Sequence, residues 1–541
     1  METLYGIATS SGLAMGKAQL LDPTRLLIPK KKSANPNDEI KKLSSALKKA
    51  TKYNTQLKEN LSKSLPPEEL EIYESYIEMI NDPEVVDQTI AYIEKEQCNV
   101  DFAYYHIQKG FISSIEQLDD PYLKQRAEDL KMITNSVLEC MLEKHDKNNS
   151  LDTPSVLIAD KIDPNQLAEL NPKLLLGLIT SKGGITDHTT IIAKALGIPF
   201  LIGVKNITEK ITTGDLVILD SENQCVTIHP SSELIEQTQL IIEQQKINWE
   251  KERESAKEKA YTQSIKTIEV LANVGSIQEA IDASDCGADG IGLLRTELCF
   301  IEQASLPDEK KHFEFYSELL SYLPDKTHTL RLLDFGSDKK FPSLPSIPEE
   351  NPAMGNRALR LGFMHYDLLL KPQIRAFLRL SSTFKIQILC PMITTLEDLD
   401  QIKKAIELEN DTLHSTGKTK TPIPPIGIMV EVPNVALHPE MFVPQADFFS
   451  FGTNDLAQFI MAADRTNAHV AHYLEAANPA LVQCITAYVN HAKKYHKKVS
   501  ICGELASNPD YLKHFIELGV ASLSMPPRLI PKIKAQITSF D

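Results

Sequence analysis

The chain has 541 residues, 42% of them hydrophobic, which is enough for three or four domains with cores of their own. Its 57 Lys and Arg residues stand against 73 Asp and Glu, and this balance of -16 argues against nucleic acid or an anionic membrane as the main partner. The eight cysteines are scattered, no apolar run reaches about 18 residues, and the N-terminus lacks a basic segment followed by an apolar core. We therefore expect a cytoplasmic protein with reduced thiols, without a disulfide frame, a zinc site or a membrane span.

The N-terminal part of the sequence predicts two kinds of structure. Residues 1–24 are interrupted by glycine and apolar enough for a strand or two, and the charge-rich stretch over 25–145 indicates a helical bundle inserted into another domain. One helix of this bundle begins at Asp120 and Pro121, and its charged face is either a solvated face or a docking face for a partner. Apolar residues recur at three-and-four spacing in this stretch, at Leu43, Leu47, Leu57, Ile72, Tyr76, Met79 and Ile80.

Residues 146–231 change to short strand-like runs with helical pieces between them. This pattern indicates a small α/β domain that also takes up the N-terminal strands. The runs are Val156–Ala159, Leu174–Thr180 and Leu216–Asp220.

A glycine-rich turn in this domain precedes a short predicted helix. Gly183 and Gly184 allow a tight turn and close approach to a ligand, Thr186 is a suitable N-cap, and Gly197 is expected to end the helix. His188 therefore falls in the first helical turn, where free N–H groups and the helix dipole favour a phosphoryl group on the imidazole. A capped helix with an incidental histidine is the alternative interpretation.

The rest of the sequence predicts a connector and a barrel. Residues 232–262 contain no Gly or Pro and indicate a long, semi-rigid helix. Over 263–541, eight apolar strand candidates alternate with helices, which predicts a (β/α)₈ TIM-type barrel with catalytic groups at the C-terminal strand ends. The candidates cover 267–273, 290–294, 329–334, 385–391, 426–430, 448–451, 499–502 and 522–525.

Charged and polar residues gather where these strands end. Arginine forks hold carboxylates and phosphates, and carboxylate oxygens hold Mg²⁺, so the set suits a small polyanion bound with a divalent cation. A single charged residue of this kind is more often part of a surface ion pair than a ligand-binding group. Because all of them are expected at the same end of the barrel, we favour a binding site. Cys502 is either a small core residue or an acid with a shifted pKa. The other residues are Arg295, Glu297, Arg331, Asp334, Lys339, Asn351, Arg357, Glu431, Asn454, Asp455, Arg465 and Glu504.

Six motifs, in matching order and spacing, carry a family resemblance. From the N-terminal strand to about residue 535, the chain resembles Enzyme I of the bacterial sugar phosphotransferase system, the phosphoenolpyruvate-protein phosphotransferase family. The motifs are GG-x-T-x-H at 183–188, GLLRTE at 292–297, DFGSDK at 334–339, MVEVP at 429–433, GTNDLAQ at 452–458 and CGELA at 502–506.

The resemblance implies a multidomain α/β fold and a shuttle. A swivelling phosphohistidine domain over 1–24 and 146–231 would carry the nucleophile His188, and the helical insert would dock the phosphocarrier protein HPr. The connector would be the pivot, Cys502 the proton donor to the enolate, and the barrel the homodimer interface. Mg²⁺ would be held by Glu431 and Asp455. Phosphoenolpyruvate would be bound by Arg295, Arg331, Arg465, Asn454 and Asp455, with Arg357 and Lys339 as further candidates.

The chain departs from the family near the proposed nucleophile. Ile185 replaces a usual Arg and Asp187 a usual Ser, and both changes make the surroundings of a phosphohistidine less positive. The interaction with one charge at about 6 Å, at an effective dielectric of about 20, is worth about 3 kcal/mol before screening. We hypothesise that Lys182 takes over the part of the missing arginine. Tyr76 stands where the family has a histidine that faces the carrier protein, and Asn356 where it has Trp.

Four further expectations concern assembly and the alternatives. The chain stops at Asp541, short of the additional C-terminal residues common in the family, so we expect a less tight dimer. A pyruvate phosphate dikinase or phosphoenolpyruvate synthase needs an ATP-binding domain with a Gly-rich loop, which this sequence does not offer. A catalytically weakened regulator that binds phosphoenolpyruvate is the other alternative. The sequence does not choose between the sugar and the nitrogen branch, although the absence of an N-terminal sensory domain favours the sugar branch.

Overall fold

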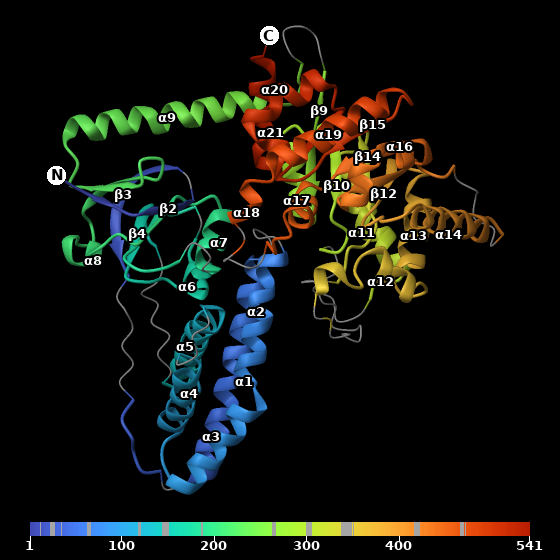
Figure 1. Ribbon diagram of the computed structural model, residues 1–541. Helices are drawn as coiled ribbons and strands as arrows, with labels where there is room; N and C mark the ends of the chain where they lie inside the picture. The colour runs from blue at the N-terminus through green and yellow to red at the C-terminus, as the bar shows by residue number, and fades with distance from the viewer. Residues whose placement is uncertain are drawn as a thin grey trace. The chain divides into compact units, whose positions relative to one another are not determined.

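The protein consists of two compact units, residues 1–244 and 245–541, which are described separately (Figure 1). In this computed structural model the described residues are 1–10, 12–21, 28–33, 35–61, 67–116, 121–142, 151–171, 173–184, 188–261, 267–298, 306–336, 349, 351–415, 422–465, 470 and 472–540.

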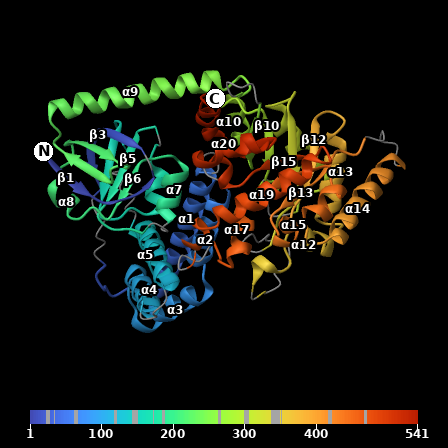
Figure 2. The ribbon, with the colours of Figure 1, turned by 45° about the horizontal axis from the view of Figure 1, so that its top comes forward.

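The first unit contains an eight-stranded sheet in the order β1-β8-β7-β3-β4-β5-β6-β2. The pairs β3-β4, β4-β5 and β5-β6 are parallel, and the other neighbouring pairs are antiparallel. Figure 2 labels β1, β3, β5 and β6 of this sheet. The N-terminal strands thus join the α/β domain, as predicted, while β6 and β8 were not predicted. The strands are β1 Glu2–Tyr5, β2 Ile7–Ser10, β3 Leu13–Leu20, β4 Ser155–Ala159, β5 Leu175–Thr180, β6 Phe200–Ile202, β7 Leu216–Asp220 and β8 Cys225–Ile228; the helices among them are α6 Pro164–Glu169, α7 His188–Ala195 and α8 Ile207–Lys210.

Helices of the predicted insert share a hydrophobic core with one side of this sheet. Helix α6 is tied to them by two hydrogen bonds: the hydroxyl of Tyr73 donates to the carbonyl of Pro164 at 3.2 Å, and Asn165 Nδ2 donates to Asn54 Oδ1 at 3.2 Å. The helices are α1 Pro36–Leu61, α2 Pro67–Ile80, α3 Pro83–Glu96, α4 Val100–Glu116 and α5 Pro121–Leu142.

Tyr76 lies inside this bundle. Tyr76 is fully buried, as its place in the apolar helical pattern predicted, although the family has at this position a histidine that faces the carrier protein. Its ring is 5.8 Å from that of Tyr73, and its hydroxyl donates to Asp129 Oδ1 at 3.4 Å. The physical reason is the helical spacing of Ile72, Tyr76 and Ile80, which places all three on the buried face of α2.

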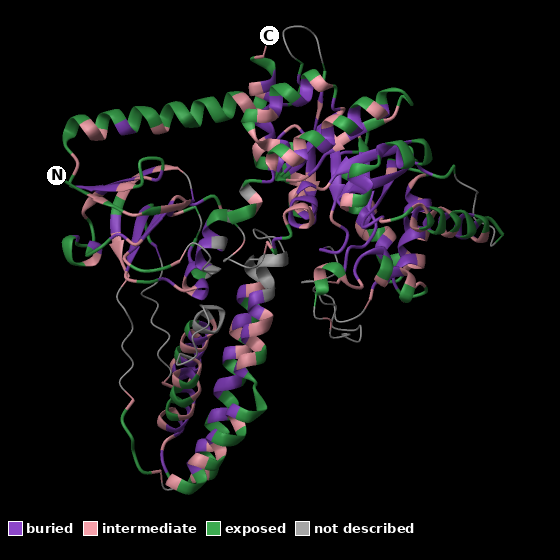
Figure 3. Ribbon diagram, viewed as in Figure 1, coloured by how far each residue is buried: buried purple, intermediate pink, exposed green. Residues whose placement is uncertain are grey.

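The connector helix α9 covers Ser232–Ser255, seven residues short of the predicted end at 262. Most of its side chains are exposed (Figure 3). The segment that follows it is anchored by Lys534, whose Nζ donates to the carbonyls of Ala256 at 2.9 Å and Glu258 at 3.0 Å. The same ammonium group reaches Gly287 O at 2.7 Å and Asp289 Oδ1 at 2.8 Å, so it joins this segment to the residues that directly precede β10.

The second unit is a closed barrel of eight parallel strands, which confirms the predicted fold class. Strand β9 closes the ring by pairing with β10 on one side and β16 on the other. The strands are β9 Glu269–Val274, β10 Gly290–Leu294, β11 Thr327–Arg331, β12 Lys385–Cys390, β13 Ile426–Val430, β14 Phe448–Phe451, β15 Lys498–Ile501 and β16 Ser522–Met525.

Helices cover the outside of the barrel, and the strands between them are almost wholly buried (Figures 1 and 3). No helix of the described residues is long and apolar enough to cross a membrane. The main helices are α10 Ile277–Asp285, α11 Glu309–Ser321, α12 Leu359–Met364, α13 Leu370–Leu380, α14 Leu396–Ser415, α17 Thr453–Met461, α19 Asn478–Lys493, α20 Pro509–Leu518 and α21 Ile530–Thr538; shorter ones are α15 Pro433–Leu437, α16 Pro439–Phe442 and α18 His472–Glu475.

Candidate active site

Two arginines at the C-terminal end of the barrel share one carboxylate. Arg331 is the last residue of β11, and its Nη1 lies 3.1 Å from Asp334 Oδ2. Arg357 Nη2 donates to both oxygens of Asp334, at 3.1 and 3.0 Å. All three residues are buried, and the other terminal nitrogen of Arg331 pairs with the buried Glu297. Because buried charges need close partners, these carboxylates allow two guanidinium groups to remain inside the barrel mouth.

A second carboxylate extends the cluster. Asp455, in the first turn of α17, accepts from Arg357 Nη1 at 3.0 Å through Oδ1, and its Oδ2 lies 3.9 Å from Arg465 Nη1. The backbone N–H of Arg465 donates to Gln458 Oε1 at 3.0 Å, so α17 also fixes the start of the loop that carries this arginine. The structure thus brings Arg331, Arg357, Asp455 and Arg465 together, as the sequence predicted.

Glu431 follows β13 and is fully buried beside these charges. One oxygen, Oε1, accepts the N–H of Met392 at 2.6 Å, whereas Oε2 has no hydrogen-bond partner among the described residues. Burial raises the pKa of Glu431 to about 8, and the negative charges of Asp455 and Asp334 act in the same direction. A group in this state is poised to accept a cation in place of a proton.

The donor set fits Mg²⁺. The unpartnered oxygen of Glu431 and the nearby carboxylate of Asp455 are the hard oxygen ligands that this ion prefers. No group of three or more His, Cys, Asp or Glu side chains with metal-site geometry occurs among the described residues. Two protein carboxylates leave coordination positions for water and for oxygens of a bound phosphate, which is the usual manner of Mg²⁺ binding.

Cys502 comes directly after β15 and is 5% exposed. Burial raises its pKa to about 11, although the hydroxyl of Ser450 and the charge of Arg331 act in the opposite direction. Its Sγ donates to the carbonyl of Phe451 at 3.4 Å. The thiol therefore keeps its proton at neutral pH, as a proton donor must.

Of the remaining predicted substrate residues, the structure describes Arg295 and Asn454 but not Lys339. Arg295 follows β10 directly and is partly exposed. Its charge lowers the pKa of the Cys502 thiol, which agrees with a place for Arg295 at the barrel mouth. Asn454 lies in the first turn of α17, and its Oδ1 accepts the N–H of Glu504 at 3.0 Å. Lys339 lies outside the described residues.

His188 is the first residue of α7, which confirms its predicted place in the first helical turn. Two hydroxyls fix this end of the helix: Thr189 Oγ1 donates to Ile162 O at 2.9 Å, and Thr190 Oγ1 donates to Gly184 O at 3.0 Å. Gly183 has a φ of 132°, a conformation that favours glycine, as the turn prediction requires. The side chain of His188 and residues 185–187, which include Ile185, Asp187 and the expected N-cap, are not among those described.

Lys182 lies just ahead of this turn. Its side chain is 70% exposed and its ammonium group is 2.5 Å from Asp160 Oδ2. Exposed ion pairs of this kind contribute little to stability, so the pair can open at small cost.

Two parts of the site escaped sequence reasoning. Asp334 and Glu297 stood in the right motifs, but their roles as counter-charges of Arg331 and Arg357 were not assigned. Asn356, which replaces the family's Trp, holds Glu349: its N–H and its Nδ2 both donate to Oε1 at 2.9 Å. The sequence offered one signal that was not used: Glu297 and Asp334 lie within three residues of Arg295 and Arg331, and Asn356 directly precedes Arg357.

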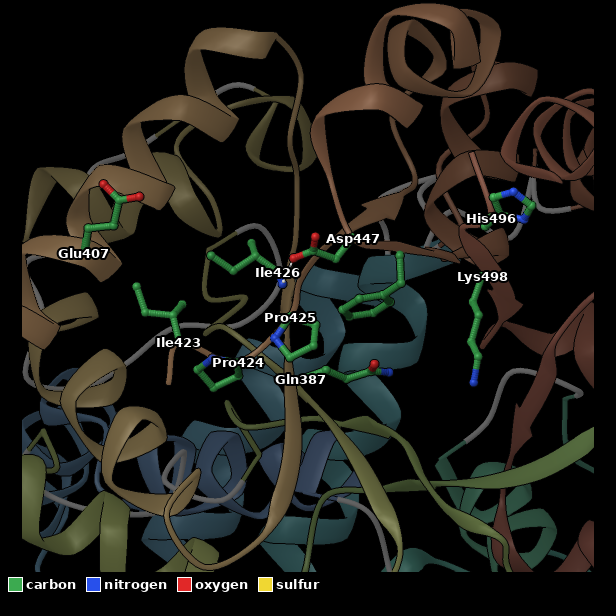
Figure 4. Close-up of a pocket in the computed structure, with 10 residues that line it drawn as sticks. Gln387, Glu407, Ile423, Pro424, Pro425, Ile426, Asp447, His496 and Lys498 are labelled. Atoms are coloured by element: carbon green, nitrogen blue, oxygen red, sulfur yellow. Dashed lines mark hydrogen bonds between the residues drawn. The ribbon is translucent and has the colours of Figure 1, made fainter. Parts of the chain in front are cut away.

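A separate hollow of about 660 Å³ lies at the opposite end of the strands (Figure 4). It is bordered by the first residues of three strands, Ile426, Phe448 and Lys498, with Glu407 on one side and His496 on the other. Because barrel enzymes carry out their chemistry at the C-terminal strand ends, this hollow is not the predicted site.

Comparison with known proteins gives matches over nearly the whole chain. Three family models match: PEP-utilising enzyme, N-terminal, at residues 5–126; its mobile domain at 151–224; and its PEP-binding domain at 249–541. Three similar proteins are each called phosphoenolpyruvate-protein phosphotransferase. That of Geobacillus stearothermophilus is 35% identical over 99% of this chain and 93% of its own length. The Mycoplasma capricolum protein is 32% identical over 99% and 94%, and the Bacillus subtilis protein 31% identical over 100% and 95%.

Proposed function

Because the chain belongs to the phosphoenolpyruvate-protein phosphotransferases, a family of phosphoenolpyruvate-utilising transferases, we propose that it performs two successive transfers. The phosphoryl group passes from phosphoenolpyruvate to His188 and then to a histidine of the phosphocarrier protein HPr, as the first step of sugar uptake. The observation that carries this proposal is the meeting of Arg331, Arg357, Asp455 and Glu431 at one barrel mouth.

Arginines of this mouth bind the substrate in the proposal. Phosphoenolpyruvate carries a carboxylate and a phosphate, and guanidinium forks match both geometrically. Arg331 and Arg357 are already held in place by Asp334, so the substrate meets donors whose positions are fixed before it arrives. Arg295, Arg465, Asn454 and Lys339 complete the proposed set.

Mg²⁺ is proposed to bind Glu431 and Asp455. When bound, the ion supplies positive charge that neutralises the phosphate oxygens during transfer. The protein supplies the two carboxylates in a buried setting, where electrostatic interactions are stronger than in water.

His188 is the proposed nucleophile and Cys502 the proposed proton donor. A neutral imidazole nitrogen forms the new N–P bond while the bond between phosphorus and the enol oxygen breaks, which leaves the enolate of pyruvate. The proton of the Cys502 thiol then goes to the methylene carbon, and pyruvate leaves. The raised pKa of that thiol supports this role, because the proton is present at neutral pH.

The same histidine serves HPr in the second transfer. We propose a phosphohistidine domain over 1–24 and 146–231, an HPr-binding helical domain over 25–145, a linker over 232–262 and a barrel and homodimer domain over 263–541. The linker acts as the pivot between the two stations of His188. Because Tyr76 is buried, recognition of HPr falls to other residues of the helical domain. Free thiols at the seven described cysteines support a cytoplasmic location.

Incubation with labelled phosphoenolpyruvate and Mg²⁺ tests the proposal. We expect a label that acid removes and base does not, that His188→Ala lacks, and that added HPr accepts. Phosphoenolpyruvate binding without any label would instead favour a regulatory homologue, which the Ile185 and Asp187 substitutions suggest.

The role of Lys182 has a test of its own. If its ammonium group leaves Asp160 and replaces the missing arginine, Lys182→Ala slows labelling of His188 while leaving phosphoenolpyruvate binding unchanged. Asp160→Asn, which frees the lysine, serves as the matched control. Equal labelling rates in Lys182→Ala and the unaltered protein would show the hypothesis to be wrong.

A further inference from the structure

Four buried polar side chains form a hydrogen-bonded chain between the barrel and two of its helices. Thr296 follows β10, Gln373 is on α13, and Tyr316 and His312 are on α11 (Figure 1). None of the four is more than 1% exposed. Polar side chains this deeply buried are costly unless their hydrogen bonds are made, so the arrangement has to be maintained by its own partners.

Gln373 is the branching point of this chain. Its Oε1 accepts the N–H of Leu333 at 2.9 Å, and its Nε2 donates to Thr296 Oγ1 at 2.9 Å and to the hydroxyl of Tyr316 at 3.2 Å. The N–H of Leu333 can only donate, which fixes the orientation of the amide. The amide oxygen of Gln373 thus accepts one hydrogen bond, and its amide nitrogen donates two.

The chain of bonds continues from Thr296 to the active-site strand. Thr296 Oγ1 accepts from Gln373 and donates to the carbonyl of Arg331 at 2.8 Å. On the other branch, the hydroxyl of Tyr316 accepts from Gln373 and lies 3.0 Å from His312 Nδ1. One glutamine thus holds two backbone groups, the carbonyl of Arg331 through Thr296 and the N–H of Leu333 directly.

These two backbone groups belong to the segment that carries the charges of the mouth. Strand β11 ends at Arg331, and Asp334 follows three residues later. The N–H of Leu332 still donates to the carbonyl of Leu389 on β12 at 3.0 Å. The carbonyl before it and the N–H after it are held instead by Gln373, through Thr296 and directly. A shift of this segment moves Arg331 and Asp334 together, and through Asp334 it also moves Arg357.

We infer that Gln373 is a positioning residue for phosphoryl transfer: without touching the substrate, it sets the course of the backbone that presents Arg331 and Asp334. The inference rests on the proposed function. Displacement of a substrate-holding group by about 1 Å can cost about a hundredfold in rate. The effect falls on the reaction at the barrel and leaves the later transfer from His188 to HPr untouched.

Gln373→Met tests this inference, with Gln387→Met as the matched control. Gln387 also makes a side-chain hydrogen bond within the barrel, to Thr329 Oγ1 at 2.7 Å, but it borders the hollow at the opposite end of the strands. We expect both variants to lower the unfolding midpoint. Only Gln373→Met should lower kcat/KM for phosphoenolpyruvate, by about 10- to 100-fold. Single-turnover transfer from each phosphorylated variant to HPr should be unchanged.

The outcomes separate the inference from the function it rests on. Equal kinetics of Gln373→Met and Gln387→Met would overturn the inference, and so would a matching loss in the transfer to HPr. Absence of label in the unaltered protein would instead overturn the proposed function. If Gln373→Met does not fold, Thr296→Val removes one hydroxyl at nearly constant shape, and Thr296→Ser restores it. Slow Thr296→Val with rescue by Thr296→Ser supports the inference, and equal rates of the two overturn it.

Discussion

The stability of the barrel should fall between pH 7 and pH 5 because of one buried histidine. His312 is 1% exposed, and burial lowers its pKa from 6.5 to about 3. Since the folded pKa lies below the unfolded one, unfolded chains take up a proton that folded chains do not. The contribution of His312 is therefore fully present above pH 6.5 and is lost as the pH falls towards 3.

The size of this loss follows from the two pKa values. One pKa unit corresponds to about 1.4 kcal/mol, so the difference between 6.5 and about 3 amounts to about 5 kcal/mol once the pH lies below both values. Between pH 7 and pH 5 only part of the titration occurs, and it gives a loss of about 2 kcal/mol. This is a large share of the stability of a typical domain.

His312→Asn removes the titration and keeps a polar group next to Tyr316. The free energy of unfolding is measured at both pH values by urea and pulse proteolysis, with barrel peptides identified by mass spectrometry. The variant loses ring packing and is less stable at both pH values, so the informative quantity is the change between them. We expect that change to be about 2 kcal/mol smaller in His312→Asn than in the unaltered protein.

The exposed His414, near the end of α14, provides the control. His414→Asn should show the same change between pH 7 and pH 5 as the unaltered protein. If His312→Asn behaves like His414→Asn, the histidine is not held neutral inside the fold and the reasoning fails.

Three other substitutions test single contacts of the second unit. Asp334→Asn should destabilise the barrel by about 3–5 kcal/mol in urea unfolding, because Arg331 and Arg357 lose their shared counter-charge. Saturating phosphoenolpyruvate should return part of that stability, and an unchanged stability of the variant would refute the role of Asp334 as a shared counter-charge. Cys502→Ser should slow pyruvate formation at least about 100-fold in a coupled assay, and an unchanged rate would rule out the thiol as proton donor. Lys534→Met should cost about 3–5 kcal/mol, because the buried Asp289 loses its counter-charge, and the double variant with Asp289→Asn should recover most of this loss; additive losses would contradict the pairing.

Barrel strands were predictable because buried parallel strands are short, nearly continuous apolar runs. The predicted bounds of the strands at 290–294, 426–430, 448–451 and 522–525 match β10, β13, β14 and β16. The strand predicted over 329–334 instead ends at Arg331, because the backbone beyond it bonds to Gln373. β6, with three residues, was too short to give a pattern.

The charged part of the site was predictable from motif positions, and its supporting contacts were not. Arg331 ends β11, Glu431 directly follows β13, and Arg357 and Asp455 lie further beyond the ends of β11 and β14. The C-terminal strand ends meet at one end of any such barrel. Gln373, by contrast, is one polar residue on the amphipathic helix α13, and its buried place depends on α11 and β10. Sequence periodicity does not reveal a contact between elements so far apart in the chain.

Closure of the barrel has a consequence for its synthesis on the ribosome. β9 pairs with β16, and Lys534 on α21 fills a site made by carbonyls that were translated more than two hundred residues earlier. Until those late residues emerge, β9 remains an open sheet edge and the early carbonyls stay hydrated. The partial barrel is thus an intermediate that chaperones can recognise, and this unit can complete its fold only after β16 and α21 have left the ribosome.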